Sequence, residues 1–200
     1  DLEFIAREVP NALMICTMAV NNETGVYQDI NLLDKTIRSN NANLAWMVDC
    51  VQALGKTNLN LAQTSIDYAP FSGHKLYAPK GIGFMYVKES SPFTPFIAGG
   101  GQESGLRSGT ENLPGLAALN EIFKMLINEG EHTFTSVDTL HLFRQQIVTA
   151  LRKVFPNIVF NHNFDNSVPT TINFAIPGFS SKEIMDLFDA ANIRVSSGSA

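Results

Sequence analysis

The chain has 200 residues, of which 44% are hydrophobic and 16% are charged, a composition typical of a globular protein with a core. A formal net charge of −5 argues against binding to nucleic acids or anionic membranes, because both attract a basic surface. No apolar run approaches the roughly 20 residues that span a bilayer. We therefore expect a cytoplasmic protein with one domain, or one domain and part of a second.

Four apolar segments in the first half of the chain are predicted to be strands. They cover residues 12–20, 44–48, 66–71 and 82–87. Turn formers at residues 21–25 end the first strand, and residues 30–39 carry apolar side chains at helical spacing. Strands that alternate with helical stretches are typical of an α/β sheet that is largely parallel.

The second half of the chain has a different pattern. A glycine-rich loop opens at residues 99–101, and Thr110 or Asn112 is expected near the N-terminal cap of the next helix. Later elements are helices at 114–128 and 136–154, strands at 157–160 and 170–175, a helix at 181–191 capped by Ser180 or Ser181, and a last strand at 193–195. We predict a first domain over residues 1–130 and a smaller α+β domain over residues 131–200.

The two cysteines are too few for a disulfide framework. Cys16 lies in an apolar run, so we expect a buried, small apolar side chain. Cys50 follows Asp49, and we expect it to be partly exposed at a strand end. Free cysteines are usually packing residues, so neither is expected to be a nucleophile.

Polar side chains stand at three of the predicted strand ends. Asn22 follows the first strand, Asp49 and Gln52 follow the second, and residues 72–75 follow the third. Ligands of open α/β sheets bind beyond the carboxyl ends of the strands, so these residues are candidates for a binding site. The alternatives are ordinary ones: Asp49 could cap the next helix, and His74 could be a structural histidine.

These residue types suit the chemistry of pyridoxal phosphate (PLP). A lysine amine, here Lys75, can form a Schiff base with the aldehyde of the cofactor. A carboxylate, here Asp49, can keep the pyridine nitrogen protonated, so that the ring acts as an electron sink. Ser72 and His74 could contribute donors for the phosphate. We expect three other lysines, Lys56, Lys80 and Lys88, to be ordinary solvated surface residues.

The segment SGHKLYAPKGIG, residues 72–83, resembles the lysine signature of the cysteine desulfurases, within the class V aminotransferases. Further blocks resemble that family in the same order, at residues 21–25, 48–52, 99–103, 107–112 and 195–200. Blocks that keep their order over nearly the whole chain are a specific resemblance. It implies the PLP-dependent fold type I, with part of the large, mainly parallel-sheet domain followed by a truncated small C-terminal α+β domain.

The resemblance implies a role for each candidate residue. Lys75 would bind PLP and then transfer protons, and His74 is the second candidate catalytic residue. Asp49 would pair with the pyridinium nitrogen, and Gln52 would hydrogen-bond the phenolic oxygen of the ring. The other cofactor contacts would be Asn22 near that oxygen and the substrate carboxylate, Ser72 and His74 at the phosphate, and Thr110 at the phosphate of the neighbouring subunit. The family would therefore be a homodimer, and no metal site is expected.

The resemblance also implies features that these 200 residues lack. The family's catalytic cysteine would follow Ala200, and a substrate-binding arginine would lie further on. A phosphate-binding Ala-Thr pair and a histidine that stacks on the ring would precede Asp1. Because the sequence starts without Met and without a signal-like segment, we expect it to belong to a longer protein and to be inactive alone.

We interpret the whole protein as a cysteine desulfurase that converts L-cysteine to L-alanine. Sulfur would pass as a protein persulfide to an iron–sulfur scaffold or another acceptor protein, for cluster or thio-cofactor assembly. A selenocysteine lyase or another class V PLP enzyme stays open, because substrate choice depends on the loop after Ala200. The alternative outside enzymes is a non-catalytic module that dimerises or docks a scaffold protein.

Overall fold

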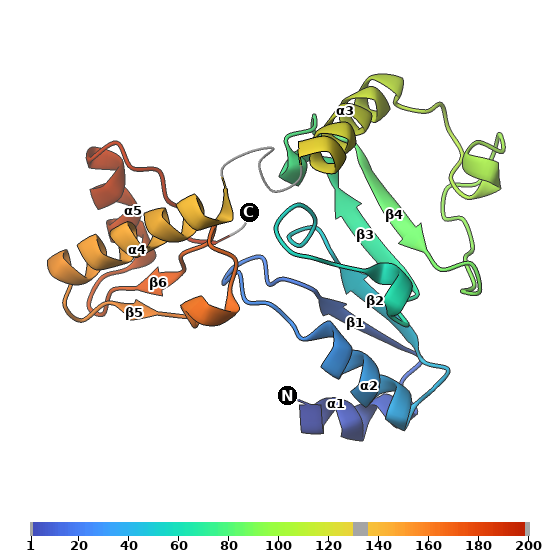
Figure 1. The fold of residues 1–200 in the computed structure, drawn as a ribbon, viewed down its shortest axis with the longest axis horizontal. Helices are drawn as coiled ribbons and strands as arrows, with labels where there is room; N and C mark the ends of the chain where they lie inside the picture. Colours follow the sequence, from blue (N-terminus) through green and yellow to red (C-terminus); the bar gives the residue numbers. More distant parts are fainter. Residues whose placement is uncertain (1, 130–135, 199–200) are drawn as a thin grey trace. The chain divides into compact units, whose positions relative to one another are not determined.

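The computed structural model describes residues 2–129 and 136–198 (Figure 1). The chain folds into two compact units: unit 1 comprises Asp1–Ala19 and Gln28–Gly130, and unit 2 comprises Val20–Tyr27 and Glu131–Ala200. The short segment Val20–Tyr27 thus folds with the C-terminal part of the chain. The assignment of residues 1–130 and 131–200 to the large and small domains of a longer enzyme stays a prediction.

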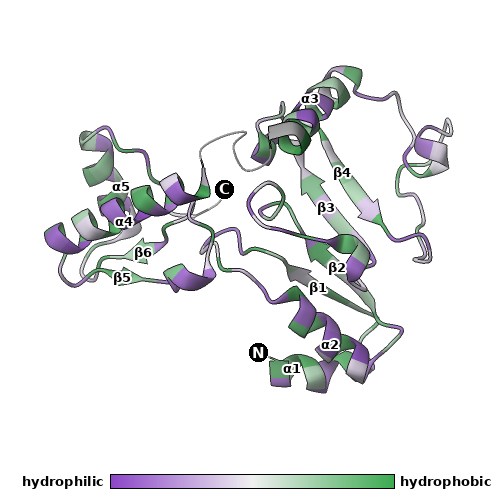
Figure 2. Cartoon of the chain, viewed as in Figure 1, coloured by the Kyte–Doolittle hydropathy of each residue, from purple (hydrophilic) through white to green (hydrophobic). Residues whose placement is uncertain are grey.

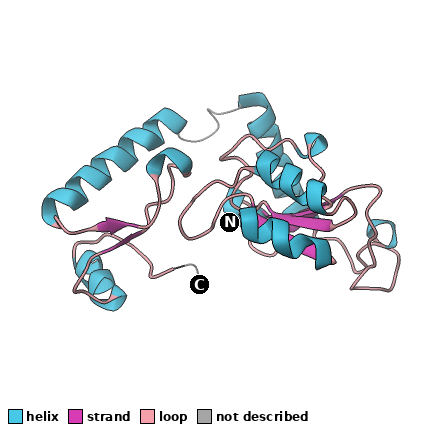
Figure 3. Ribbon diagram, turned by 90° about the horizontal axis from the view of Figure 1, so that it is seen from below, coloured by secondary structure: helices cyan, strands magenta, loops and turns pink. Residues whose placement is uncertain are grey.

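Unit 1 is built on a four-stranded sheet with the strand order β1-β2-β3-β4. Its strands are β1 (Met14–Met18), β2 (Ala45–Asp49), β3 (Tyr68–Ser72) and β4 (Gly83–Val87). The first three strands run parallel, and β4 pairs antiparallel with β3. The predicted α/β fold with a mainly parallel sheet is therefore confirmed, and Figure 3 shows these strands among the helices that accompany them.

Strand β2 forms the buried centre of this sheet. Trp46 and Val48 are 0% exposed, and Figure 2 shows the hydrophobic character of the strand. The Trp46 indole Nε1 donates to the Thr17 hydroxyl of β1 over 3.0 Å, so its polar atom is satisfied inside the core. A strand of this kind is apolar along most of its length because both faces of a parallel sheet are covered. Its polar end at Asp49 therefore stands out.

Three helices belong to unit 1: α1 (Leu2–Glu8), α2 (Ile30–Asn40) and α3 (Leu113–Glu129). Helix α1 was not predicted, whereas α2 and α3 follow the predicted ranges closely. The Asp29 carboxylate caps α2 by accepting from the Leu32 N–H. The Asn112 side chain, rather than Thr110, caps α3, because Asn112 Oδ1 accepts from the Gly115 N–H over 3.1 Å.

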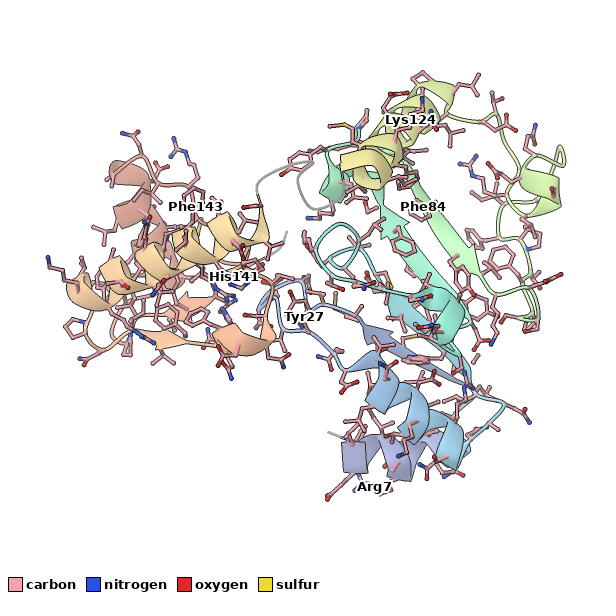
Figure 4. All side chains as sticks on the ribbon, viewed as in Figure 1. Arg7, Tyr27, Phe84, Lys124, His141 and Phe143 are labelled. Atoms are coloured by element: carbon pink, nitrogen blue, oxygen red, sulfur yellow. The ribbon has the colours of Figure 1, made fainter. Side chains whose placement is uncertain are left out.

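A hydrophobic cluster fixes α3 against the turn that follows β3. Its buried members are Leu76, Ala78, Leu119 and Ile122, and Leu54, Ile82, Phe123 and Leu126 pack around them. Phe84 of β4 extends the cluster by stacking on Phe71 and contacting the ring edge of Phe123 (Figure 4). Each large side chain buried in this way contributes about 1.5–3 kcal/mol. The turn after β3 is therefore held by the core, although it carries polar residues.

Unit 2 contains the helices α4 (Val137–Val154) and α5 (Ser181–Ala190) and an antiparallel pair of short strands, β5 (Val159–Phe160) and β6 (Phe174–Ala175). Ser180 caps α5 in a capping box with Glu183, so of the two caps predicted, Ser180 and Ser181, the first is confirmed. The strand predicted at 193–195 is wrong. Asn192 adopts a left-handed φ of 58°, and the Ile193 N–H donates to the Phe188 carbonyl at the end of α5, so this backbone terminates a helix rather than pairing with a strand.

Arg144 on α4 organises the interior of unit 2. Its side chain is 7% exposed and donates to the carbonyl oxygens of Phe164, Ser167 and Val168 over 2.8–3.3 Å. It also lies over the Phe164 ring, 5.2 Å from the ring centroid. Arg144 thereby ties α4 to the segment 164–168.

The segment Val20–Tyr27 joins unit 2 through backbone hydrogen bonds to the same region. The Tyr27 N–H donates to the Asn166 carbonyl, and the Val168 N–H donates to the Gly25 carbonyl. Gly25 has a φ of 73°, and a Cβ there would lie 2.8 Å from Thr171 Cβ. Only glycine fits this close approach.

Over the described ranges, no helix combines the length and the apolar character needed to cross a membrane.

Candidate cofactor site

Two of the expected polar strand ends lie on one edge of the unit 1 sheet. Asp49 ends β2 and Ser72 ends the neighbouring parallel strand β3, and the Cys50 N–H donates to the Pro70 carbonyl across the pair. Asp49 Oδ1 accepts from the Val51 N–H over 2.9 Å. The carboxylate therefore fixes the turn after β2, a local role close to the expected alternative of a helix cap. It also stands at the edge where open α/β sheets generally bind their ligands.

Lys75 lies on a tightly held turn, the 3-10 helix η3 (Gly73–Leu76). The Gly73 N–H donates to the Ile82 carbonyl and its own carbonyl accepts from the Ala78 N–H, both over 3.0 Å. A Cβ at position 73 would lie 2.9 Å from the Ile82 oxygen, so the turn requires glycine. Leu76 is buried in the cluster on α3, whereas Lys75 is exposed. A rigid base thus presents a reachable amine.

The two expected phosphate contacts lie beside each other on this turn. Ser72 Oγ and His74 Nδ1 are 2.8 Å apart, a hydrogen bond between the two side chains. Because the hydroxyl occupies Nδ1, the other ring nitrogen of His74 is the one free to meet a ligand. Both side chains are therefore positioned together at the carboxyl end of β3.

Gln52 occupies the turn after β2, where it meets Lys56, a residue that sequence reasoning did not place at the site. The Lys56 ammonium donates to Gln52 Oε1. Lys56 is half-buried, so the prediction that it is an ordinary surface lysine is wrong. Burial lowers the pKa of Lys56, and the nearby charge of Lys75 lowers it further. The spacing of four residues between Gln52 and Lys56, short enough for the two side chains to meet on one turn, was the signal that could have found it.

The other two lysines set aside by sequence reasoning differ from each other. Lys80 is exposed, as predicted, whereas Lys88 is half-buried. The Lys88 N–H donates to the Asp67 carbonyl, which holds the end of β4 against the start of β3. Of the three lysines, Lys80 is therefore the one that matches the expected exposed surface position.

Both expectations about the cysteines are wrong. Cys50 is 0% exposed, because its backbone continues the pairing of β2 with β3 into the core. Burial, and secondly the charge of Asp49, raise the pKa of the Cys50 thiol to about 12. Cys16 is exposed, because it shares with Met14 a face of the outermost strand β1 that is left open. The environment of Cys50 therefore does not favour a nucleophilic thiolate.

Asn22 belongs to unit 2, on a turn that Asn21 stabilises. Asn21 Oδ1 accepts from the N–H groups of Glu23 and Thr24, and Asn22 Nδ2 donates to Glu23 Oε1 over 3.0 Å. A Cβ on Gly198 would lie 3.3 Å from Glu23 Oε2. Unit 2 therefore brings the block at 21–25 next to the last described residues of the chain.

Thr110 lies in unit 1, at the end of the glycine-rich loop. It is exposed, and the capping of α3 by Asn112 leaves its hydroxyl out of the helix cap. Gly101, Gly105 and Gly109 in this loop all have positive φ angles. The loop therefore depends on glycine for its path.

Comparison with known proteins decides the family. A family model described as aminotransferase class-V matches residues 4–200. The chain belongs to the class V aminotransferases. It is similar to cysteine desulfurase 2 of Trichormus variabilis, 35% identical over 199 residues, and to cysteine desulfurase NifS of Azotobacter vinelandii, 33% identical over 201 residues.

Both matches include all of this class V chain and 48–49% of the relative, so the chain spans about half the length of the curated relatives it matches. A solved NIFS-like protein superposes on 98% of the chain and 53% of its own, with a TM-score of 0.89 and 30% identity. This likeness confirms the predicted PLP-dependent fold type I for the part of the fold that the chain covers.

The side chains at the edge of the unit 1 sheet fit the cofactor of class V enzymes. PLP is an anionic ring with one basic nitrogen. Ser72 and His74 can offer donors for its phosphate, Lys75 an amine for its aldehyde, and Asp49 a carboxylate for its nitrogen. Within residues 2–129 and 136–198, no cluster of His, Cys, Asp and Glu is arranged to hold a metal ion.

Proposed function

We propose that the complete natural protein containing this sequence is a PLP-dependent cysteine desulfurase. The observation that carries the proposal is the grouping of Asp49, the Ser72–His74 pair and Lys75 at the carboxyl ends of two adjacent parallel strands. Relatives named cysteine desulfurase match over the whole of this chain, which favours L-cysteine as the substrate.

Each side chain has a distinct task in this proposal. The Lys75 amine would hold the cofactor covalently and, once the substrate amine replaced it, would move the proton at the substrate Cα. When bound, PLP supplies an electron sink for the carbanion at that carbon. The Asp49 carboxylate would keep the pyridine nitrogen protonated, and Ser72 with His74 would bind the phosphate.

The remaining residues would complete the site. Gln52 would hydrogen-bond the phenolic oxygen, and Asn22 would lie near that oxygen and the substrate carboxylate. Thr110 would bind the phosphate of the partner subunit, which would make the active protein a homodimer. Its exposed hydroxyl, outside the cap of α3, supports this role.

The sulfur chemistry needs a separate thiolate. That thiolate would attack the sulfur of bound cysteine and break its bond to Cβ, and the carbon side would keep the electron pair and take up a proton. The products would be L-alanine and an enzyme persulfide for an iron–sulfur scaffold or another acceptor. Cys50 is unsuited, because burial and the charge of Asp49 keep its thiol protonated. Cys16 is exposed, but it lies within strand β1, which is paired with β2, whereas a thiol that carries sulfur to an acceptor needs a mobile loop. We therefore propose a nucleophile other than these two cysteines, and expect the isolated chain to release no alanine.

The cofactor assignment is tested by spectroscopy and mass spectrometry. We expect the complete protein to absorb at about 400–430 nm, and borohydride to fix PLP on the peptide that carries Lys75. Lys75→Ala should lose both the absorbance and the adduct, while Lys80→Ala at the exposed neighbouring lysine should keep both. An adduct that persists on another lysine in Lys75→Ala would overturn the assignment.

The substrate is tested by supplying L-cysteine and L-selenocysteine in parallel. Alanine released from L-cysteine together with a persulfide mass on the enzyme is the expected result. Turnover of selenocysteine alone would make the protein a lyase, and cofactor binding without turnover of either would favour the non-catalytic module.

A further inference from the structure

We propose that Lys56 is a positioning residue, which orients the Gln52 amide so that its NH₂ group is free to donate to the cofactor ring. The inference rests on the proposed PLP function and goes beyond it, because it gives a task to a residue outside the expected cofactor contacts.

The geometry of the turn after β2 brings Gln52 and Lys56 together. The Leu54 N–H donates to the Cys50 carbonyl and the Thr57 N–H donates to the Ala53 carbonyl, so the segment 50–57 is tightly turned, with Gly55 in the left-handed region inside it. On this turn the Lys56 ammonium donates to Gln52 Oε1. Ala53, fully buried, anchors the turn in the core.

The chemistry of the two groups makes this contact directional. An ammonium only donates hydrogen bonds, whereas an amide has one accepting oxygen and one donating nitrogen. By taking the oxygen of Gln52, Lys56 leaves the NH₂ group as the free end. A phenolate oxygen accepts hydrogen bonds, so it requires that end. Without Lys56, the amide could rotate and present its oxygen to another oxygen, which is repulsive.

A contact between the two turns of the site brings Lys56 close to Lys75. Gly55 adopts a φ of 74°, and a Cβ there would lie 3.0 Å from Leu76 Cδ2. The residues next to this contact are Lys56 on one turn and Lys75 on the other. The packing of Gly55 on Leu76 therefore places two cationic side chains in the same neighbourhood.

This arrangement does not favour folding by itself. Burial and the charge of Lys75 both lower the pKa of Lys56, which means that both disfavour its charged form. Lys56 takes part in none of the salt bridges formed among the residues that the structure describes. An ammonium held at an electrostatic disadvantage is typical of a functional site, where an anionic ligand compensates for it.

The test compares lysine-to-methionine changes in the complete PLP-loaded protein. Its readout is the pH midpoint of the change in the visible spectrum of bound PLP. We expect Lys56→Met to raise that midpoint by about one pH unit, because a hydrogen bond to the ring oxygen is lost. Lys56→Arg keeps a donor for Gln52 and should stay within about 0.3 units of the wild type. Lys80→Met is the matched control and should leave the midpoint unchanged.

A second pair of variants separates orientation from charge. If Lys56 acts through Gln52, then adding Lys56→Met to Gln52→Ala should move the midpoint no further. An equal shift in both backgrounds would overturn the proposal, since it would show a direct effect of charge. A Lys56→Met midpoint equal to that of Lys80→Met would overturn it as well.

Folding is checked on the cofactor-free proteins. We expect Lys56→Met to melt at or above the wild-type temperature, because it removes a cation that burial and Lys75 disfavour. If Lys56→Met melts well below the wild type, Lys56→Leu provides the second neutral variant for the spectra. Failure of the wild type to bind PLP would instead overturn the proposed function itself, so the two failures are distinct.

Discussion

Arg144 of unit 2 and Lys56 of unit 1 are basic side chains withdrawn from solvent, and the two are satisfied in different ways. Arg144 of unit 2 donates to the carbonyl oxygens of Phe164, Ser167 and Val168, so its charge is used to close a loop. Lys56 of unit 1 donates to the Gln52 amide and stands near another lysine. Arg144 serves the fold, whereas Lys56 lies where an anionic ligand would be needed to compensate for its charge.

The surroundings of the two residues support the same distinction. The pKa of the Arg144 guanidinium is lowered, chiefly by burial, and the charges of Tyr27 and Asp165 offset part of that shift. Both influences on Lys56 lower its pKa. The charged neighbours of Arg144 therefore compensate for part of its burial, whereas the charged neighbour of Lys56 adds to the cost of burying it.

The comparison predicts the largest effect at Arg144. Arg144→Met should lower the free energy of unfolding by about 3 kcal/mol, because several buried carbonyl acceptors would lose their donor at once. Urea unfolding followed by circular dichroism measures this loss. The control is Lys153→Met, an exposed position on the same helix, which should change stability by less than about 0.5 kcal/mol. Equal stability of the two variants would show that Arg144 does not hold unit 2 together.

In unit 1, by contrast, removal of a charge at the site should affect chemistry and leave the fold intact. Asp49→Asn keeps an oxygen that accepts from the Val51 N–H, so the turn after β2 should persist. In the complete protein the variant should still bind PLP, but turnover should fall by on the order of 100-fold or more, because the pyridine nitrogen loses its anionic partner. Near-normal turnover would make Asp49 a turn cap alone.

The smallest expected effect is the pH dependence of unit 2. Both ring nitrogens of His162 are buried without a hydrogen-bond partner among the described residues, and burial followed by the charge of Arg144 lowers the pKa of the imidazole. Since the unfolded chain then binds a proton more readily, the stability that neutral His162 provides is present above the ordinary pKa near 6.5 and is lost as the pH falls below it.

Chemical unfolding between pH 7.5 and roughly pH 5 measures that loss. His162→Phe should flatten the profile, because phenylalanine packs against Phe164 without a titrating nitrogen. A slope that survives unchanged in this variant would show that His162 does not cause it.

Most strands and helices could be predicted from local patterns. The apolar run that becomes β2 and the capped segment that becomes α5 carry their signals within a few residues. The segment 193–195 carried an equally good strand signal, but its backbone closes the end of α5. No local pattern shows whether a neighbouring strand exists to receive it.

The sequence by itself determined the order of the elements, the family blocks and the residue types proposed to meet PLP at Asp49 and Lys75, because these depend on neighbours along the chain. Only the tertiary structure decided which side chains are covered: it buried Cys50, exposed Cys16 and placed Lys56 on Gln52. The physical reason is that burial and electrostatics depend on groups that distant segments bring together, as Gly55 and Leu76 do beside the two lysines.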